Sequence, residues 1–181
     1  RQLEAYFDML DARFEGEWLI YNFPARTGCD VDAALVAKLA ARFSRFMGIK
    51  DTVDCASHTR AIVRAVEGVR SDFSVLCGFD EYFIPNLMNG GDGVLSGLNN
   101  VTPELFVRAK KAFHDGDLVE VSAAHKEIGR LSAVYAVGDD FVTTIKTAAA
   151  LKSGGLEPAS RGYGGALDDA QVGEVKRLFK L

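Results

Sequence analysis

The strongest constraint on the fold is a regular alternation of short apolar segments with longer amphipathic ones. The apolar segments predict four strands, at 18–22, 46–50, 74–78 and 93–96. The strand centres are separated by 29, 27 and 19 residues, counted between Ile20, Ile49, Leu76 and Leu95. Each interval is long enough for one crossover helix, so the cadence predicts βα units with parallel strands. Because the segments are almost continuously apolar, we expect these strands to be buried on both faces.

Amphipathic segments between and after the strands predict the helices. Within 30–43, apolar residues recur at every fourth position, which places them on one helical face. Asp54 is a candidate N-cap for the next helix, and Pro103 is a candidate first-turn residue of a later one. After the fourth strand we expect only helices, the last three at 118–137, 141–151 and 170–181, with a glycine-rich connector at 153–165.

Four βα units do not close a barrel, so two α/β architectures compete. Open sheets of the flavodoxin or Rossmann kind predict a glycine-rich phosphate loop after the first strand. The sequence there, Tyr-Asn-Phe-Pro-Ala-Arg-Thr-Gly at 21–28, is no such loop. We therefore predict the second half of a TIM (β/α)8 barrel, strands five to eight, over 1–115, with a C-terminal helical extension packed on it over 116–181. The chain opens inside a helical pattern without Met, so we expect the first half of the barrel to precede it.

Composition narrows the classes of function. The chain has 21 Lys and Arg against 25 Asp and Glu, a formal net charge of −4, which argues against a nucleic-acid-binding protein. No apolar run approaches the roughly 18 residues of a membrane span. The chain has three cysteines, Cys29, Cys55 and Cys77, and no two of them are closely spaced. This pattern predicts neither a disulfide framework nor a zinc site, so we expect a cytoplasmic protein. The histidines share no spacing, so we expect surface positions and no metal site: His58, His114 and His125.

The rule that TIM barrels carry reactive residues at the C-terminal ends of their strands selects Tyr21, Lys50, Gly78 and Leu95. Lys50 ends an apolar run, and burial of an ammonium favours the neutral amine, which is a nucleophile toward ketones. Alternatively, the Lys50 side chain extends to solvent and pairs with Asp51 or another carboxylate.

Two further side chains near the same strand ends suggest roles in catalysis or binding. The Tyr21 hydroxyl could relay protons, or it could belong to a core tyrosine bonded to a backbone carbonyl. Arg26 could clamp a substrate carboxylate through two parallel hydrogen bonds, or it could hold an acidic neighbour.

Two motifs in register give the chain a family resemblance. Tyr-Asn-x-Pro-x-x-Thr-Gly at 21–28, followed by Gly-Ile-Lys at 48–50, resembles the dihydrodipicolinate synthase and N-acetylneuraminate lyase superfamily. Gly78 and the segment 90–96 resemble the family's seventh and eighth strand ends, and the resemblance extends over the whole chain.

The resemblance implies a class I pyruvate-dependent aldolase or lyase on an eight-stranded barrel. Lys50 would form the Schiff base with pyruvate, Tyr21 would shuttle protons, and the Leu95 carbonyl would border the pyruvate. Arg26 and Gly78 would also bind substrate. The imine serves as the electron sink, so the resemblance implies no metal and no organic cofactor. It also implies a homotetramer.

The subgroup rests on fewer residues. Asp51-Thr52 and the segment 140–146 look most like 2-keto-3-deoxygluconate aldolases, which cleave a 2-keto-3-deoxy sugar acid reversibly to pyruvate and an aldehyde. Arg26 instead matches the arginine with which the synthases grip their aldehyde substrate's carboxylate. The alternatives are therefore a 4-hydroxy-tetrahydrodipicolinate synthase, which joins pyruvate to aspartate semialdehyde, and a silent barrel that binds a keto acid. A silent barrel would be expected to lose Lys50 or Tyr21.

One departure from the family pattern bears on activity. The family's paired hydroxyl motif for the pyruvate carboxylate and its tyrosine near the fourth strand would both lie upstream of Arg1. We therefore expect this chain alone to be inactive or very weakly active.

Overall fold

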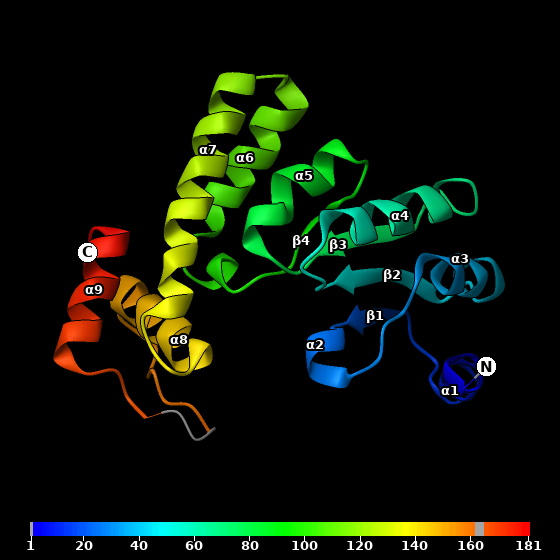
Figure 1. The fold of residues 1–181 in the computed structure, drawn as a ribbon, viewed down its shortest axis with the longest axis horizontal. Coiled ribbons are helices and arrows are strands. Elements are labelled where there is room, and N and C mark those ends of the chain that lie inside the picture. The colour runs from blue at the N-terminus through cyan, green and yellow to red at the C-terminus, as the bar shows by residue number, and fades with distance from the viewer. Residues whose placement is uncertain (1, 162–164) are drawn as a thin grey trace. The chain divides into compact units, whose positions relative to one another are not determined.

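The computed structural model describes residues 2–161 and 165–181, so part of the connector predicted at 153–165 lies outside the described residues. The strands are β1 (Trp18–Asn22), β2 (Phe46–Asp51), β3 (Ser74–Cys77) and β4 (Gly93–Val94). The α-helices are α1 (Gln2–Arg13), α2 (Pro24–Thr27), α3 (Ala33–Arg42), α4 (Ala56–Glu67), α5 (Phe83–Met88), α6 (Pro103–Asp115), α7 (Leu118–Leu131), α8 (Phe141–Ser153) and α9 (Asp169–Phe179) (Figure 1). The short 3-10 helices are η1 (Asp80–Tyr82), η2 (Leu98–Asn100) and η3 (Ser132–Ala136).

The strands form one parallel sheet in the order β1-β2-β3-β4, as the cadence of apolar segments predicts. Helices α3 and α4, which connect successive strands, lie side by side (Figure 1). The register brings Tyr21 opposite Lys50, Asn22 opposite Asp51, and Lys50 opposite Leu76. The ends of β1, β2 and β3 therefore meet along one edge of the sheet.

The two faces of β1 differ sharply in exposure. Trp18, Ile20 and Asn22 are buried, whereas Leu19 and Tyr21 are 52% and 55% exposed. The expectation that every strand is buried on both faces is therefore wrong for β1, because helices cover only one side of it. We call these the covered side and the open side of the sheet.

An aromatic stack anchors the covered side. Trp18 stacks on Phe46 with ring centroids 4.5 Å apart, and Phe46 meets Phe73 edge-on at 4.8 Å. Phe7 of α1 also stacks on Trp18, with ring centroids 5.8 Å apart. Aromatic pairs of this kind stabilise a core by about 0.5–1.5 kcal/mol each beyond the area they bury.

The helix ends correct some predictions. α4 begins after Cys55, and Asp54 accepts a hydrogen bond of 2.6 Å from the Tyr82 hydroxyl instead of capping the helix. That hydrogen bond, together with burial, raises the pKa of Tyr82 to about 12. The helix predicted at 118–137 is α7 followed by η3, and α2 follows β1 where no helix was predicted.

The chain divides into two compact units, 1–95 and 96–181. The first holds the whole sheet, and the second holds α6 to α9. The sequence predicts a different division, after residue 115, which places α6 with the half barrel. That division concerns how the complete barrel is built, and it remains a prediction.

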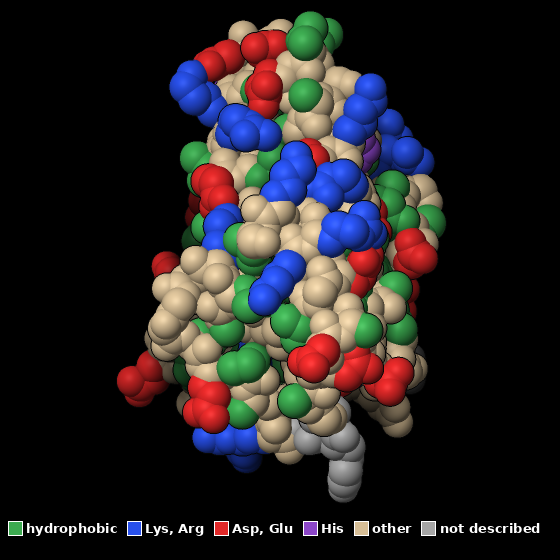
Figure 2. Space-filling model, turned by 90° about the vertical axis from the view of Figure 1, so that its left-hand side faces the viewer, with side chains coloured by type: hydrophobic (Ala, Val, Ile, Leu, Met, Phe, Trp, Pro, Cys, Tyr) green, Lys and Arg blue, Asp and Glu red, His purple; other side chains and the backbone are tan. Residues whose placement is uncertain are grey.

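The second unit is helical and carries a charged surface. Asp140 caps α8 by accepting from the backbone nitrogens of Val142 and Thr143. On the side of α7 to α9, Lys and Arg side chains gather across the upper middle, with Asp and Glu mainly around and below them (Figure 2). Within the described residues, no helix combines the length and the apolar character needed to cross a bilayer.

The absence of a side chain at Gly48 allows β2 and β3 to lie close together. A Cβ on Gly48 would lie 2.5 Å from the Ser74 carbonyl oxygen, which belongs to the backbone and cannot turn away. Gly48→Ala should therefore lower the free energy of unfolding by about 1–3 kcal/mol. Urea denaturation measures the change. Gly68→Ala is the control, because nothing lies within 4 Å of a Cβ there; equal midpoints for the two variants would contradict the close approach.

Candidate active site

Lys50 and Tyr21 meet on the open side of the sheet. They are direct partners in the β1–β2 ladder, and the Lys50 Nζ lies 4.0 Å from the centroid of the Tyr21 ring. An ammonium at this distance is attracted by the face of the ring. Tyr21 is more than half exposed, so it is not the core tyrosine of the alternative interpretation. The structure thus brings together the two residues predicted to be catalytic.

The predicted substrate-binding residues follow the ends of three strands: Arg26 lies after β1, Gly78 after β3 and Leu95 after β4. The Gly78 nitrogen donates to the Asp51 carbonyl at 2.8 Å, and the Leu95 nitrogen donates to the Cys77 carbonyl at 3.0 Å. Leu95 has a half-exposed side chain. Arg26 lies on α2, directly after β1, with its Cζ 5.7 Å from the centroid of the Phe23 ring.

Thr52 and Gly78 are packed against one another at this edge. A Cβ on Gly78 would overlap the Thr52 hydroxyl, so only glycine fits there. The Thr52 hydroxyl is buried and has no hydrogen-bond partner among the described residues. It is a polar group beside the candidate site that sequence reasoning used only for the subgroup.

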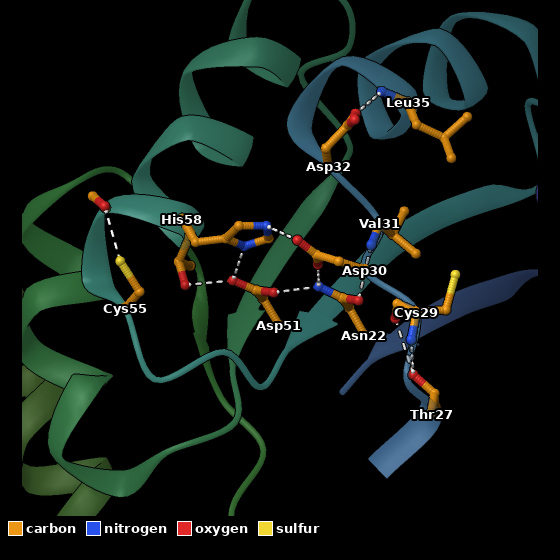
Figure 3. A network of polar contacts seen from close by, with 12 residues as sticks. Asn22, Thr27, Cys29, Asp30, Val31, Asp32, Leu35, Asp51, Cys55 and His58 are labelled. Carbon is orange, nitrogen blue, oxygen red and sulfur yellow. Dashed lines mark hydrogen bonds and ion pairs between the residues drawn. The ribbon is translucent and has the colours of Figure 1, made fainter. Parts of the chain in front are cut away.

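A polar network around the buried side chains of Asn22 and Asp51, which extends to the exposed Asp30, lies on the covered side (Figure 3). It lies opposite the reactive pair, because successive side chains of a strand point to opposite sides. Asn22 donates through Nδ2 to Asp51 Oδ1 and to Asp30 Oδ1, both at 2.9 Å. Its Oδ1 accepts from the backbone nitrogen of Val31 at 3.1 Å. The other oxygen of Asp51 accepts from the Thr59 hydroxyl at 2.6 Å. The Asp51 carboxylate is thus hydrogen-bonded on the covered side. It is not paired with Lys50, so the structure does not support the alternative interpretation in which Lys50 pairs with Asp51.

His58 completes this network, so the expectation of a surface histidine is wrong for it. Its Nδ1 lies 3.0 Å from Asp51 Oδ2, and its Nε2 lies 3.2 Å from Asp30 Oδ2. Burial on its own lowers the pKa of His58. The hydrogen bond and negative charge of Asp51, with a further contribution from Asp30, outweigh burial and raise that pKa above its ordinary value. An imidazolium carries a proton on both ring nitrogens and so can face a carboxylate with each, whereas a neutral ring carries a proton on only one.

The sequence analysis did not predict the network of Asn22, Asp51 and His58, although the sequence contains one signal of it. Successive side chains of a strand point to opposite sides, so the residue after Tyr21 and the residue after Lys50 must both face the covered side. Polar groups buried there need hydrogen-bond partners. The partners come from α4 and from the loop before α3, which strand patterns alone do not identify.

The remaining polar candidates have limited chemistry. Cys77 is fully buried, and burial raises the pKa of its thiol to about 12, so it stays protonated. Among the described residues, no cluster of three or more His, Cys, Asp or Glu side chains is placed to hold a metal ion. An amine and a phenol side by side can add to a carbonyl and move a proton, which is the chemistry of an imine-forming enzyme.

Comparison with known proteins gives consistent matches. The sequence profile of the Dihydrodipicolinate synthetase family matches residues 1–168. The chain is 34% identical over 180 residues to YagE of Escherichia coli, which carries the name of a 2-dehydro-3-deoxy-D-gluconate aldolase. It is 36% identical over 146 residues to YjhH of the same organism, which carries the name of a 2-dehydro-3-deoxy-D-pentonate aldolase.

The structural match agrees with these relatives. The crystal structure of YagE, a prophage protein of the dihydrodipicolinic acid synthase family in complex with pyruvate, superposes with a TM-score of 0.91 at 33% identity. The match covers 97% of this chain and 59% of YagE. The alignments with YagE and YjhH cover 97% and 81% of this chain but 58% and 48% of those proteins, so the chain spans about half the length of these relatives.

The His58 network predicts a pH-dependent stability. Because folding raises the pKa of His58, its contribution is complete below the unfolded value of about 6.5 and is lost as pH rises through the folded pKa. His58→Asn keeps a donor toward Asp51 but does not titrate. The stability difference between the unsubstituted chain and this variant should therefore shrink as pH rises from about 6.5.

Urea midpoints measured at a series of pH values test this prediction. His114→Asn is the control, because His114 is exposed on α6 in the other unit. A constant difference between the unsubstituted chain and His58→Asn at all pH values would rule out the proton-linked contribution.

Proposed function

The chain belongs to the Dihydrodipicolinate synthetase family, and from this premise we propose that it is part of a pyruvate-dependent aldolase whose nucleophile is Lys50. The observation that carries the proposal is the contact of the Lys50 Nζ with the Tyr21 ring at the C-terminal ends of two parallel strands. The crystal structure of YagE in complex with pyruvate supports pyruvate as the keto acid.

The reaction follows from the chemistry of the amine. The neutral Lys50 nitrogen adds to the keto carbon of pyruvate, and water leaves as the imine forms. The protonated imine draws electrons from the neighbouring methyl group, which loses a proton and becomes an enamine. The enamine carbon then adds to the aldehyde carbon, which restores the protonated imine, and the aldehyde oxygen takes up a proton. Water hydrolyses this imine, which releases the keto acid product and the free Lys50 amine. Cleavage runs through the same steps in reverse, and Tyr21 is the group we assign to carry the proton.

The remaining residues receive supporting roles. We assign the Leu95 carbonyl and Gly78 to the border of the pyruvate site, at the ends of β4 and β3. Arg26 is the candidate for a carboxylate or hydroxyl of the second substrate, since a guanidinium can form paired hydrogen bonds. The chemistry of the imine requires no metal or organic cofactor.

We further propose that this chain corresponds to the second half of a (β/α)8 barrel. The open side of the sheet supports this, because exposed apolar residues there would face the interior of a closed barrel. The first half would bring the group that binds the pyruvate carboxylate, so the chain alone should turn over very weakly. A cytoplasmic homotetramer remains part of the proposal.

For the second substrate we propose a 2-keto-3-deoxy sugar acid. The names of YagE and YjhH support this class, as does Asp51-Thr52 after the lysine. Arg26 is the residue that favours the synthase alternative, in which pyruvate condenses with aspartate semialdehyde.

Borohydride trapping tests the nucleophile. The chain incubated with pyruvate and borohydride should gain the mass of one reduced pyruvyl imine, located on the peptide that contains Lys50. Trapping requires only the amine and the keto acid, so it should be detectable even where turnover is weak. Lys50→Arg should abolish it, because a guanidinium stays protonated and cannot form the imine. An adduct spread over several surface lysines, with Lys50 unmodified, would sink the proposal.

Comparing two reactions tests the substrate class. We expect cleavage of 2-keto-3-deoxygluconate, followed as pyruvate release, to exceed condensation of pyruvate with aspartate semialdehyde by about tenfold or more. Only the ratio is needed, so weak turnover suffices, and Lys50→Arg supplies the blank for both assays. The reverse ratio would favour the synthase. Trapping at Lys50 with neither reaction above the blank, in a protein that also carries the first half of the barrel, would favour a silent keto-acid-binding barrel.

A further inference from the structure

The rung of the sheet that follows the reactive pair is locked by side chains. Asn22 and Asp51 are direct partners in the ladder, one position beyond Tyr21 and Lys50. Their side chains hydrogen-bond to each other at 2.9 Å on the covered side. Because alternate side chains face opposite sides, the two pairs lie back to back across the backbones of β1 and β2.

The Asp51 carboxylate is held from several directions. It is fully buried, and its oxygens accept from Asn22 of β1 and from Thr59 and His58 of α4. A carboxylate buried in this way is costly to dislodge, since any movement leaves charge without a hydrogen-bond donor. The position of Asp51 is therefore among the best determined in the first unit.

Backbone hydrogen bonds link the fixed position of Asp51 to the strands that carry the reactive pair. The Thr52 nitrogen donates to the Asn22 carbonyl, and the Gly78 nitrogen donates to the Asp51 carbonyl, both at 2.8 Å. These bonds continue the ladder past the end of β2 and join it to β1 and β3. The hydrogen bonds of Asp51 thus hold the peptide unit that joins it to Lys50. Among the described residues, the Lys50 side chain has no such anchor and extends over the half-exposed Tyr21 ring on the open side.

We propose that Asp51 is a positioning residue for Lys50: its buried carboxylate, hydrogen-bonded to Asn22 and Thr59, fixes the end of β2 so that the amine stays against Tyr21. The inference rests on the proposed function for its catalytic meaning. Its structural content, that Asp51 controls where the Lys50 amine lies, can be measured without pyruvate.

Asp51→Asn is the main variant, because it keeps the size of the side chain and removes one acceptor oxygen and the charge. Two reactions of Lys50 should then change in opposite directions. The maximal rate of borohydride trapping with pyruvate should fall by about tenfold or more, with a smaller change in the half-saturating pyruvate concentration, because the amine loses its alignment.

Acetic anhydride is the second probe, and it needs no alignment. Once the amine leaves the face of the Tyr21 ring, acetylation of Lys50 should accelerate by about twofold or more. Peptide mass spectrometry reads the rate, with Lys126, exposed on α7 in the other unit, as the internal reference. A variant that had only lost stability would not slow one reaction and speed the other under conditions where it remains folded.

Asp54→Asn is the matched control, since it makes the same chemical change at an exposed position three residues further along. It should leave both reactions of Lys50 unchanged. If Asp51→Asn fails to fold, Thr59→Val removes a single donor to the same carboxylate and should give the same pair of changes at smaller size. Circular dichroism establishes folding of each variant.

The outcomes separate the two proposals. Slower trapping and faster acetylation in Asp51→Asn, with neither change in Asp54→Asn, would support the positioning role. Unchanged acetylation in Asp51→Asn and Thr59→Val would overturn it, whatever the trapping shows. If the unsubstituted chain is never trapped by pyruvate, the proposed function fails, and acetylation still decides whether Asp51 holds the amine.

Discussion

The parallel pairing of β1 with β2 is the interaction on which the candidate site depends. It sets Tyr21 opposite Lys50 and then Asn22 opposite Asp51. Because side chains alternate along a strand, a slip of one residue would carry the amine to the covered side and the carboxylate to the open side. The hydrogen bonds of Asn22 and Asp51 therefore specify the register as well as stabilise it, and the place of the reactive pair follows from that register.

Local sequence properties were enough to predict this arrangement in outline. The spacing of apolar segments predicted parallel strands, and the rule about strand ends pointed to Tyr21 and Lys50 from position alone. Burial was harder to predict, since the apolar character of a segment does not say what covers each of its faces. Leu19 and Tyr21 are exposed for that reason, although the same segment contributes Trp18 and Ile20 to the core.

The polar network shows a second limit of sequence reasoning. His58 was expected at the surface because the three histidines of the sequence share no spacing. Its partners are two aspartates, one at the end of β2 and one in the loop before α3, and only the folded sheet brings them together. Buried polar groups depend on partners distant in sequence, so their role emerges at the level of packing rather than of local pattern.

The two sides of the sheet have different roles in the proposed chemistry. The covered side fixes geometry through the aromatic stack and the network around Asp51. The open side holds the amine, but the face of the Tyr21 ring attracts an ammonium and so does not by itself release the proton that imine formation requires. Removing water from around Lys50 would favour the neutral amine. A cover over the open side, such as the first half of the proposed barrel, would therefore activate the nucleophile as well as complete the substrate site, and we expect both to depend on the same contacts.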